Sequence, residues 1–271
     1  MINGMQAAII KKDIRAIISN KRMLSVLIIV PIVMAIGMPL SLGLSILLAP
    51  LDGSNIEQFS SMLGPSGLAS ALDLTSEVEV RRVVFGMLYN NILPLFFLMI
   101  PIITSSAMAA SAFVGEKERN TLETLLYCPL PLNKIFSAKI IASFLVGFAI
   151  SLISFVVMTA TILCGSLFLI GAAITPGLIW FAVLLLVAPA VSFIAISLIV
   201  RGSAKAQSSE EAQQRGALLV LPVVLLAVGQ FAGLLMLSAY VILVGGAALA
   251  LVAWLLFRGL FAKFKYETLL R

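Results

Sequence analysis

The side chains that could do chemistry gather in one stretch, residues 115–139, which holds seven of the chain's thirty charged residues. Asn120 and Glu123 have the spacing of a capping box, so Asn120 is predicted to cap a helix that Pro129 ends. Three leucines of this short helix share one face, because they fall at i, i+3 and i+4. They are Leu122, Leu125 and Leu126. An apolar face among charges predicts a surface for a protein partner.

The inventory of reactive residues argues against catalysis by this chain. It contains no histidine, and its two cysteines, Cys128 and Cys164, are far apart in the sequence, so we expect no metal site, disulfide framework or cysteine nucleophile. No Gly-x-x-x-x-Gly-Lys-Ser/Thr motif occurs, so any ATP and magnesium would be bound by a partner. We therefore predict that the chain is not an enzyme and binds no cofactor of its own.

Composition places the chain in a membrane. Its 271 residues are 61% hydrophobic and 11% charged, with a mean hydropathy of +1.15, which predicts an all-α polytopic membrane protein with a single domain over 1–271. A membrane-spanning helix needs about twenty apolar residues, and six stretches meet that length. The predicted spans are 23–48, 89–114, 140–170, 177–200, 217–237 and 239–257. The last two could instead contain a re-entrant segment, because the turn between them is poorly marked.

The distribution of positive charge predicts the orientation. With both termini in the cytoplasm, the cytoplasmic segments hold sixteen of the eighteen Lys and Arg residues, as the positive-inside rule requires. Segment 115–139 is then a cytoplasmic loop and segment 50–82 is extracellular. Residues 5–22 form a predicted amphipathic helix at the membrane surface, with Ile10, Ile14, Ile17 and Ile18 on its apolar side. A net charge of +6 does not indicate nucleic-acid binding, because the basic residues bracket apolar spans.

Within the six predicted spans there is no Asp, Glu, Lys, Arg or His. A transporter driven by protons or ions generally needs such groups, so we expect the energy for transport to come from outside the membrane. A few polar side chains are candidates for lining a transport pathway, although packing between helices explains Ser and Thr equally well. The candidates are Gln230, Asn90, Asn91 and Ser105.

The segment from Glu116 to Lys139 resembles the first cytoplasmic loop of type-2 ABC-transporter permeases, in its Glu-Arg-x-Thr-Leu-Glu-x-Leu-Leu-x-x-Pro-Leu pattern followed by Lys. The segment Ala212–Pro222, at the start of the fifth span, is a second resemblance, to some exporter permeases of the same family. In that family the first loop carries a coupling helix that sits in a groove of the ATP-binding subunit. The resemblance assigns this role to Glu116, Glu118, Arg119, Asn120, Thr121, Leu122, Glu123, Leu125, Leu126 and Pro129.

The resemblance implies the permease subunit of an ATP-driven ABC exporter in a prokaryotic cell (inner, cytoplasmic) membrane. Its partners would be an ATP-binding cassette subunit, which holds ATP and Mg, a second identical or related permease subunit, and the lipid bilayer. Uncharged spans favour a hydrophobic or amphipathic cargo, such as a peptide, drug or lipid. Two alternatives stay open: a non-transporting membrane anchor or sensor that recruits a soluble partner, and a sodium exporter subunit.

Overall fold

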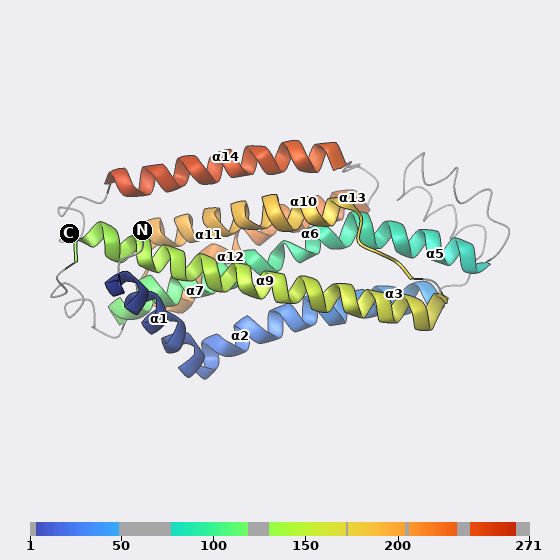
Figure 1. Ribbon diagram of the computed structural model, residues 1–271, viewed down its shortest axis with the longest axis horizontal. Helices are drawn as coiled ribbons and strands as arrows, with labels where there is room; N and C mark the ends of the chain where they lie inside the picture. Colours follow the sequence, from blue (N-terminus) through green and yellow to red (C-terminus); the bar gives the residue numbers. More distant parts are fainter. Residues whose placement is uncertain are drawn as a thin grey trace.

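A computed structural model describes residues 4–48, 77–118, 130–171, 173–203, 206–231 and 239–263. These ranges form an elongated bundle of helices with no strand among them, and six of the helices are long and apolar enough to cross a membrane (Figure 1). The all-α prediction and the number of spans are thereby confirmed. The six stretches are Met23–Leu48, Arg81–Glu118, Asn133–Phe168, Leu178–Gly202, Ser209–Gln230 and Tyr240–Gly259.

Several of the long stretches consist of more than one element. The elements are α1 (Gly4–Ser19), α2 (Lys21–Ile32), η1 (Val33–Gly37), α3 (Met38–Leu48), α5 (Glu77–Met87), η2 (Leu88–Ile92), α6 (Leu93–Phe97), α7 (Met99–Glu118), α9 (Leu132–Ile170), α10 (Leu178–Ala182), η3 (Val183–Val187), α11 (Ala188–Gly202), α12 (Ser209–Ala217), α13 (Val220–Phe231) and α14 (Ala239–Lys263). The predicted extracellular segment 50–82 lies mostly outside the described residues, except for the start of α5.

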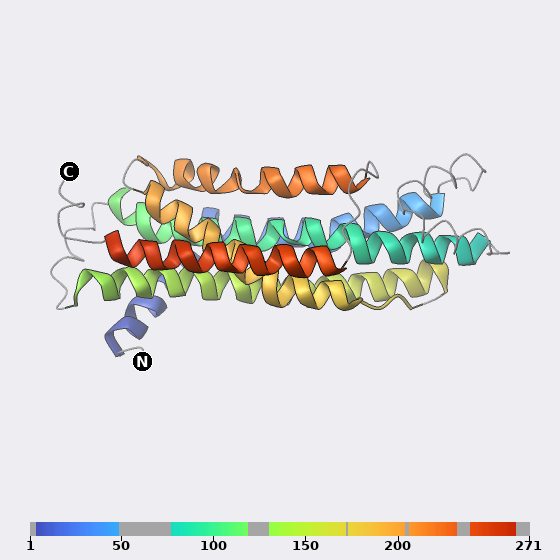
Figure 2. The ribbon, with the colours of Figure 1, turned by 90° about the horizontal axis from the view of Figure 1, so that it is seen from above.

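The helix that ends in α7 is the centre of the bundle. In its most apolar stretch 83% of the residues are buried, against 17% for the stretch in α14. α7 packs against α2, α9, α11 and α12, whereas α14 packs on α10, η3 and α11 at the periphery, along the top of the bundle in Figure 1 and nearest the viewer in Figure 2. Most residues in the apolar stretch of α14 are therefore not buried by the rest of the described chain.

Prolines explain the three π-helical turns. Pro39, Pro94 and Pro189 each stand two residues after one of these turns, η1, η2 and η3 respectively. A proline has no N–H to donate to the carbonyl four residues back, and its ring collides with that carbonyl. A widened turn just before the proline relieves both problems within a continuous helix. Pro222 also interrupts the regular helix. A turn at Leu218–Leu219, just before this proline, separates α12 from α13.

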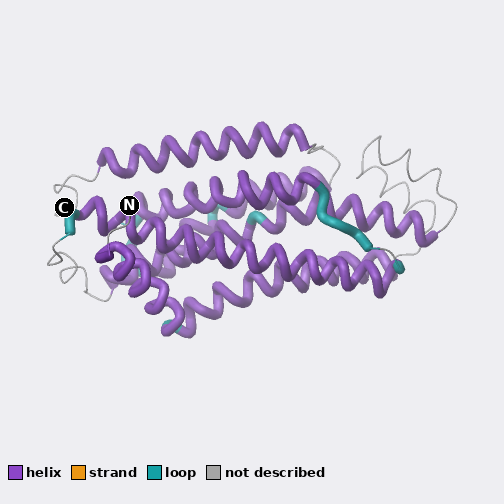
Figure 3. The backbone as a smooth tube through the Cα atoms, viewed as in Figure 1, coloured by secondary structure: helices purple, strands orange, loops and turns teal. Residues whose placement is uncertain are grey.

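The reversal between α9 and α10 lies where the sequence predicts a turn. Gly171 caps α9 with a left-handed backbone (φ 72°) and donates its N–H to the carbonyl of Leu167 at 3.2 Å. A loop over residues 173–177 then leads into α10, visible as the teal segment in Figure 3. Only glycine adopts this φ without steric cost, which explains its presence at the cap.

Small residues bring α7 close to its neighbours on two sides. A Cβ atom at Gly147 of α9 would lie 2.1 Å from Ser105 Oγ and 3.1 Å from Ser105 Cα. A Cβ at Gly216 of α12 would lie 2.7 Å from Ser106 Oγ. Both serines are buried, so α7 is wedged between helices at adjacent positions of one turn.

Candidate functional site

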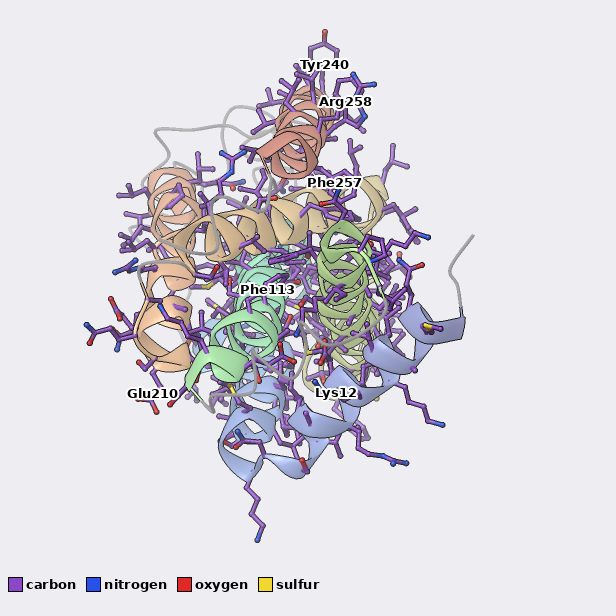
Figure 4. All side chains as sticks on the ribbon, turned by 90° about the vertical axis from the view of Figure 1, so that its left-hand side faces the viewer. Lys12, Phe113, Glu210, Tyr240, Phe257 and Arg258 are labelled. Carbon is purple, nitrogen blue, oxygen red and sulfur yellow. The ribbon has the colours of Figure 1, made fainter. Side chains whose placement is uncertain are left out.

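The charged side chains that form ion pairs or could bind a partner concentrate at one end of the bundle, which we call the charged end. It comprises α1, the C-terminal turn of α7 and the N-terminal turns of α9 and α12. α1 lies obliquely across this end, beneath α7 and α9 in the view of Figure 4. The face of α1 that it buries consists of Gln6, Ile9, Asp13 and Ile17.

Apolar contacts and a polar tie hold α1 in place. Ile9 packs with Ile135 and Ala138 of α9, and Ile17 joins a cluster that includes Met108 of α7. Gln6 Nε2 donates to the carbonyl of Lys134 at 3.2 Å. The helix is therefore docked on the bundle along its whole length, while Ile18 is 61% exposed.

Beneath α1 lies a buried cluster of ion pairs. Lys139 Nζ lies 2.8 Å from Glu116 Oε2 and 3.7 Å from Asp13 Oδ2, and it donates to the carbonyl of Ala112 at 2.6 Å. Lys12 Nζ lies 2.8 Å from the other oxygen of Glu116. The side chains of Lys139 and Asp13 are 3% and 5% exposed. Two acids and two bases from α1, α7 and α9 thus balance in charge.

Burial dominates the electrostatics of Asp13. It raises the pKa of the Asp13 carboxyl above its ordinary value, and the positive charge of Lys139 opposes that rise. Asp13 Oδ2 has no hydrogen-bond partner, because Lys139 is too distant to donate. Lys139 is the cation within ion-pair distance of both acids, and its charge offsets much of the cost of burying them.

Hydrogen bonds also hold the start of α12, after the connection from α11, against the C-terminal turn of α7. Glu118 Oε2 accepts from the N–H and the hydroxyl of Ser209, at 3.2 and 2.8 Å, and Lys117 Nζ donates to the carbonyl of Ala206 at 3.3 Å. Ser208 caps α12 by accepting from the N–H of Glu211, whose carboxylate accepts from the N–H of Gln207. These two bonds at the start of α12, together with those to Glu118 and Lys117, make residues 206–217 an ordered part of the bundle end.

These contacts surround the base of the predicted coupling loop. Glu116 and Glu118 close the C-terminal end of α7, and α9 begins at Leu132. Eight of the predicted interface residues, from Arg119 to Pro129, lie outside the described residues, so the predicted coupling helix stays a prediction. Of the two that are described, Glu116 lies in the ion cluster and Glu118 binds α12. Neither is free for a partner in this arrangement.

The four predicted pathway residues do not share one site. Asn90 Oδ1 accepts from the N–H of Gly177 at 2.7 Å, and Asn91 donates to the carbonyl of Met87 at 3.0 Å, so each amide has a structural bond. Ser105 lies against Gly147. Gln230 on α13 is 6% exposed, and its Oε1 has no hydrogen-bond partner. Ser105 Oγ also has no hydrogen-bond partner, so the described contacts leave the polarity of both Ser105 and Gln230 unexplained.

The ion cluster was not predicted from the sequence, although one signal was present. Asp13 is the only acid among residues 1–22, and it stands at i+4 from Ile9 and i−4 from Ile17, on one helical face. An acid in an apolar row predicts a buried partner. Lys139 was placed in the loop, whereas α9 begins seven residues earlier and carries it into the bundle.

Comparison with known proteins gives the family. The family described as "ABC-2 family transporter protein" matches residues 7–257, nearly the whole chain. The chain belongs to this family. No curated protein and no solved structure matches it.

Membership in the ABC-2 family confirms the resemblance seen in the sequence. It makes the chain a multi-pass membrane protein and a transport component of an ABC system, and it implies a partner with an ATP-binding cassette. Such permeases are usually without catalytic activity themselves. In this ABC-2 chain, two connections lie at the charged end. One runs from α7 to α9, and the other runs from α11 to α12.

Proposed function

We propose that the chain is the permease subunit of an ATP-driven ABC exporter that moves a hydrophobic or amphipathic cargo outward. The family match over residues 7–257 carries this proposal. In this proposal the charged end faces the cytoplasm of a prokaryotic cell, in agreement with the sixteen cytoplasmic Lys and Arg residues. Two ATP-binding subunits and a second permease subunit, identical or related, complete the transporter.

The ion cluster suggests how force would pass from the partner to the spans. The helix predicted within residues 120–128 would dock on the ATP-binding subunit. Its two flanking helices, α7 and α9, are joined by the pair Lys139–Glu116 directly above the loop, and α1 is joined to both. A push on the loop would thus move three helices as one body, rather than bend the loop.

The decisive experiment purifies the tagged chain in mild detergent from its native host and measures the ATPase that remains bound. We expect a stoichiometric ATP-binding subunit with wild-type chain. Leu126→Asp should remove it and the associated ATP hydrolysis, because a charge would replace an apolar contact of the docking face.

Leu178→Asp is the matched control, since Leu178 is 73% exposed at the opposite end of the bundle and should retain the partner. A chain that purifies with no ATPase would instead favour a membrane anchor or sensor. A partner that stays bound to Leu126→Asp would place the docking surface elsewhere, and residues 206–217 would be tested next.

Gln230 gives a prediction about cargo. In Gln230→Leu we expect unchanged or slightly higher thermal stability, because a buried amide oxygen without a partner is replaced by an apolar group of similar size. If the amide meets cargo, the stimulation of ATP hydrolysis by a panel of peptides, drugs and sodium should change in rank order. An unchanged rank order would indicate that Gln230 does not contact cargo and only packs between helices.

A further inference from the structure

One face of α1 stays uncovered, because the helix lies at the outer edge of the bundle (Figure 4). The covered face is centred on Asp13. Lys11 and Arg15 each stand two positions from Asp13, so each points about 160° away from it around the helix. Both are exposed, and neither forms an ion pair within the described residues. As an i, i+4 pair they place two positive charges side by side, facing away from the protein.

Contacts on the two flanks of α1 fix its rotation relative to the bilayer. On one flank, Ile14 packs against the cluster that contains Met108 of α7 and Met23, the first residue of a span. On the other flank, Lys12 pairs with Glu116 in the last turn of α7. Met108 precedes Glu116 by eight residues, so the isoleucine flank reaches about 12 Å deeper into the bundle. That flank therefore faces the bilayer, and the Lys12 flank faces the water beyond the span.

An exposed apolar side chain continues the membrane-facing flank. Ile18 stands one turn after Ile14, on the way to α2, and is 61% exposed. The sequence predicts Ile17 and Ile18 on one apolar side at the membrane surface, but Ile17 packs inside the bundle and Ile18 stays on the surface. Two cations beside an apolar side chain, at the level where a span begins, are typical of a helix in the headgroup layer.

The direction of the charge pair favours lipid over a protein partner as its ligand. Lys11 and Arg15 point sideways from the bundle, beside the first turns of the spans, whereas a soluble subunit would dock beyond the ends of the spans. The anions at that level in a bilayer are the phosphate groups of the lipids, and an anionic leaflet attracts basic side chains close to its surface.

We propose that α1 binds anionic phospholipids of the adjacent leaflet through Lys11 and Arg15. The ammonium and guanidinium groups would bind lipid phosphate oxygens, and Ile18 would lie among the first carbons of the acyl chains. The proposal requires only that the chain spans a bilayer. It holds whether or not the chain exports cargo or binds an ATP-binding subunit.

A fluorophore at the end of α1 makes this binding measurable. Bimane is attached to Ser19→Cys, one turn after Arg15, in a chain whose Cys128 and Cys164 are replaced by serine. The full chain, without an ATP-binding subunit, is reconstituted in phosphatidylcholine vesicles with rising fractions of brominated phosphatidylglycerol or, in a second series, brominated phosphatidylcholine. Half-maximal quenching should need about 25-fold less of the anionic lipid, because each cation contributes about fivefold.

The double variant Lys11→Gln/Arg15→Gln should lose this difference between the two lipids. It should keep the quenching by brominated phosphatidylcholine, which shows that α1 is still in place. Lys134→Gln/Arg215→Gln is the matched control: it removes two exposed cations of the charged end that lie on α9 and α12, and it should keep the difference.

Equal half-maximal fractions of the two lipids with Lys11 and Arg15 intact, or a difference that survives in Lys11→Gln/Arg15→Gln, would overturn the proposal. Loss of the difference on addition of inorganic phosphate would overturn it in favour of a free anion. A chain without lipid preference, whose ATP-binding subunit is lost on purification of Lys11→Gln/Arg15→Gln, would instead assign this face to that subunit.

Discussion

The Lys139→Met variant is expected to lose about 3–5 kcal/mol of folding free energy, the cost typical of removing one partner from a buried ion pair. Lys139 is 3% exposed at its side chain and is the cation shared by Glu116 and Asp13. Without it, Asp13 keeps no cation within ion-pair distance in the described structure, and the carbonyl of Ala112 loses its donor. α1 should come loose from α9 as a result.

Unfolding by SDS in mixed micelles would measure the loss, and limited proteolysis would follow α1. Lys134→Met, on the exposed side of the same helix, should change stability by no more than about 0.5 kcal/mol. The triple variant Lys139→Met/Glu116→Gln/Asp13→Asn should recover part of the loss, since no unpaired charge remains buried. Equal stability of Lys139→Met and Lys134→Met would contradict the cluster.

The loss in Lys139→Met should also depend on pH. Burial raises the pKa of Asp13 and Lys139 lowers it, so removal of Lys139 raises that pKa further. A carboxyl whose pKa is raised by folding stabilises the folded state below its unfolded pKa, and that contribution is lost as pH rises through the folded pKa. The deficit of the variant should therefore shrink as the pH falls from neutral toward the carboxyl range.

Gly147→Leu is expected to prevent assembly of the bundle, and Gly147→Ala to cost about 1–3 kcal/mol, the usual range for overpacking. The added Cβ would lie 2.1 Å from Ser105 Oγ, which can rotate away, but also 3.1 Å from Ser105 Cα, which can move only with α7. Because α7 is also held by Gly216 on its other side, it has little room to shift. The yield of monodisperse protein and its SDS unfolding would measure both effects.

Gly165→Ala provides the control for Gly147→Ala on the same helix. No atom lies within 4 Å of a Cβ at Gly165, so alanine there should be neutral or stabilising by up to about 1 kcal/mol. Ser105→Ala combined with Gly147→Ala removes the hydroxyl contact but not the backbone contact, and should restore only part of the loss. Full restoration would show that the backbones are not in close contact.

The sequence predicted the features that a bilayer imposes on any spanning segment, namely its length and its apolar character. A span must be a continuous apolar helix, so the six stretches could be found from length and hydropathy. The reversal between the predicted spans 140–170 and 177–200 also carried a local signal, because Gly171, Pro176 and Gly177 favour a turn there. These features depend on residues close together in the chain, which a pattern can reveal.

What could not be predicted depends on pairing between distant segments. Lys139 follows Ala138 and precedes Ile140, and nothing in that neighbourhood shows that Asp13, far away in the chain, will approach it. Asn90 was a candidate for lining a transport pathway, but its side-chain Oδ1 accepts from the N–H of Gly177, 87 residues later. Both pairings follow from how helices pack, which periodicity alone leaves open.

The three π-helical turns have a consequence for comparing this chain with its relatives. Each widened turn accommodates one residue more than a regular helix would need, and one residue rotates an α-helix by about 100°. A relative that lacks Pro39, Pro94 or Pro189 can keep the same faces in contact only by also lacking one residue there. Single-residue gaps at 33–37, 88–92 and 183–187 are therefore expected in sequence alignments, inside spans where gaps are usually forbidden.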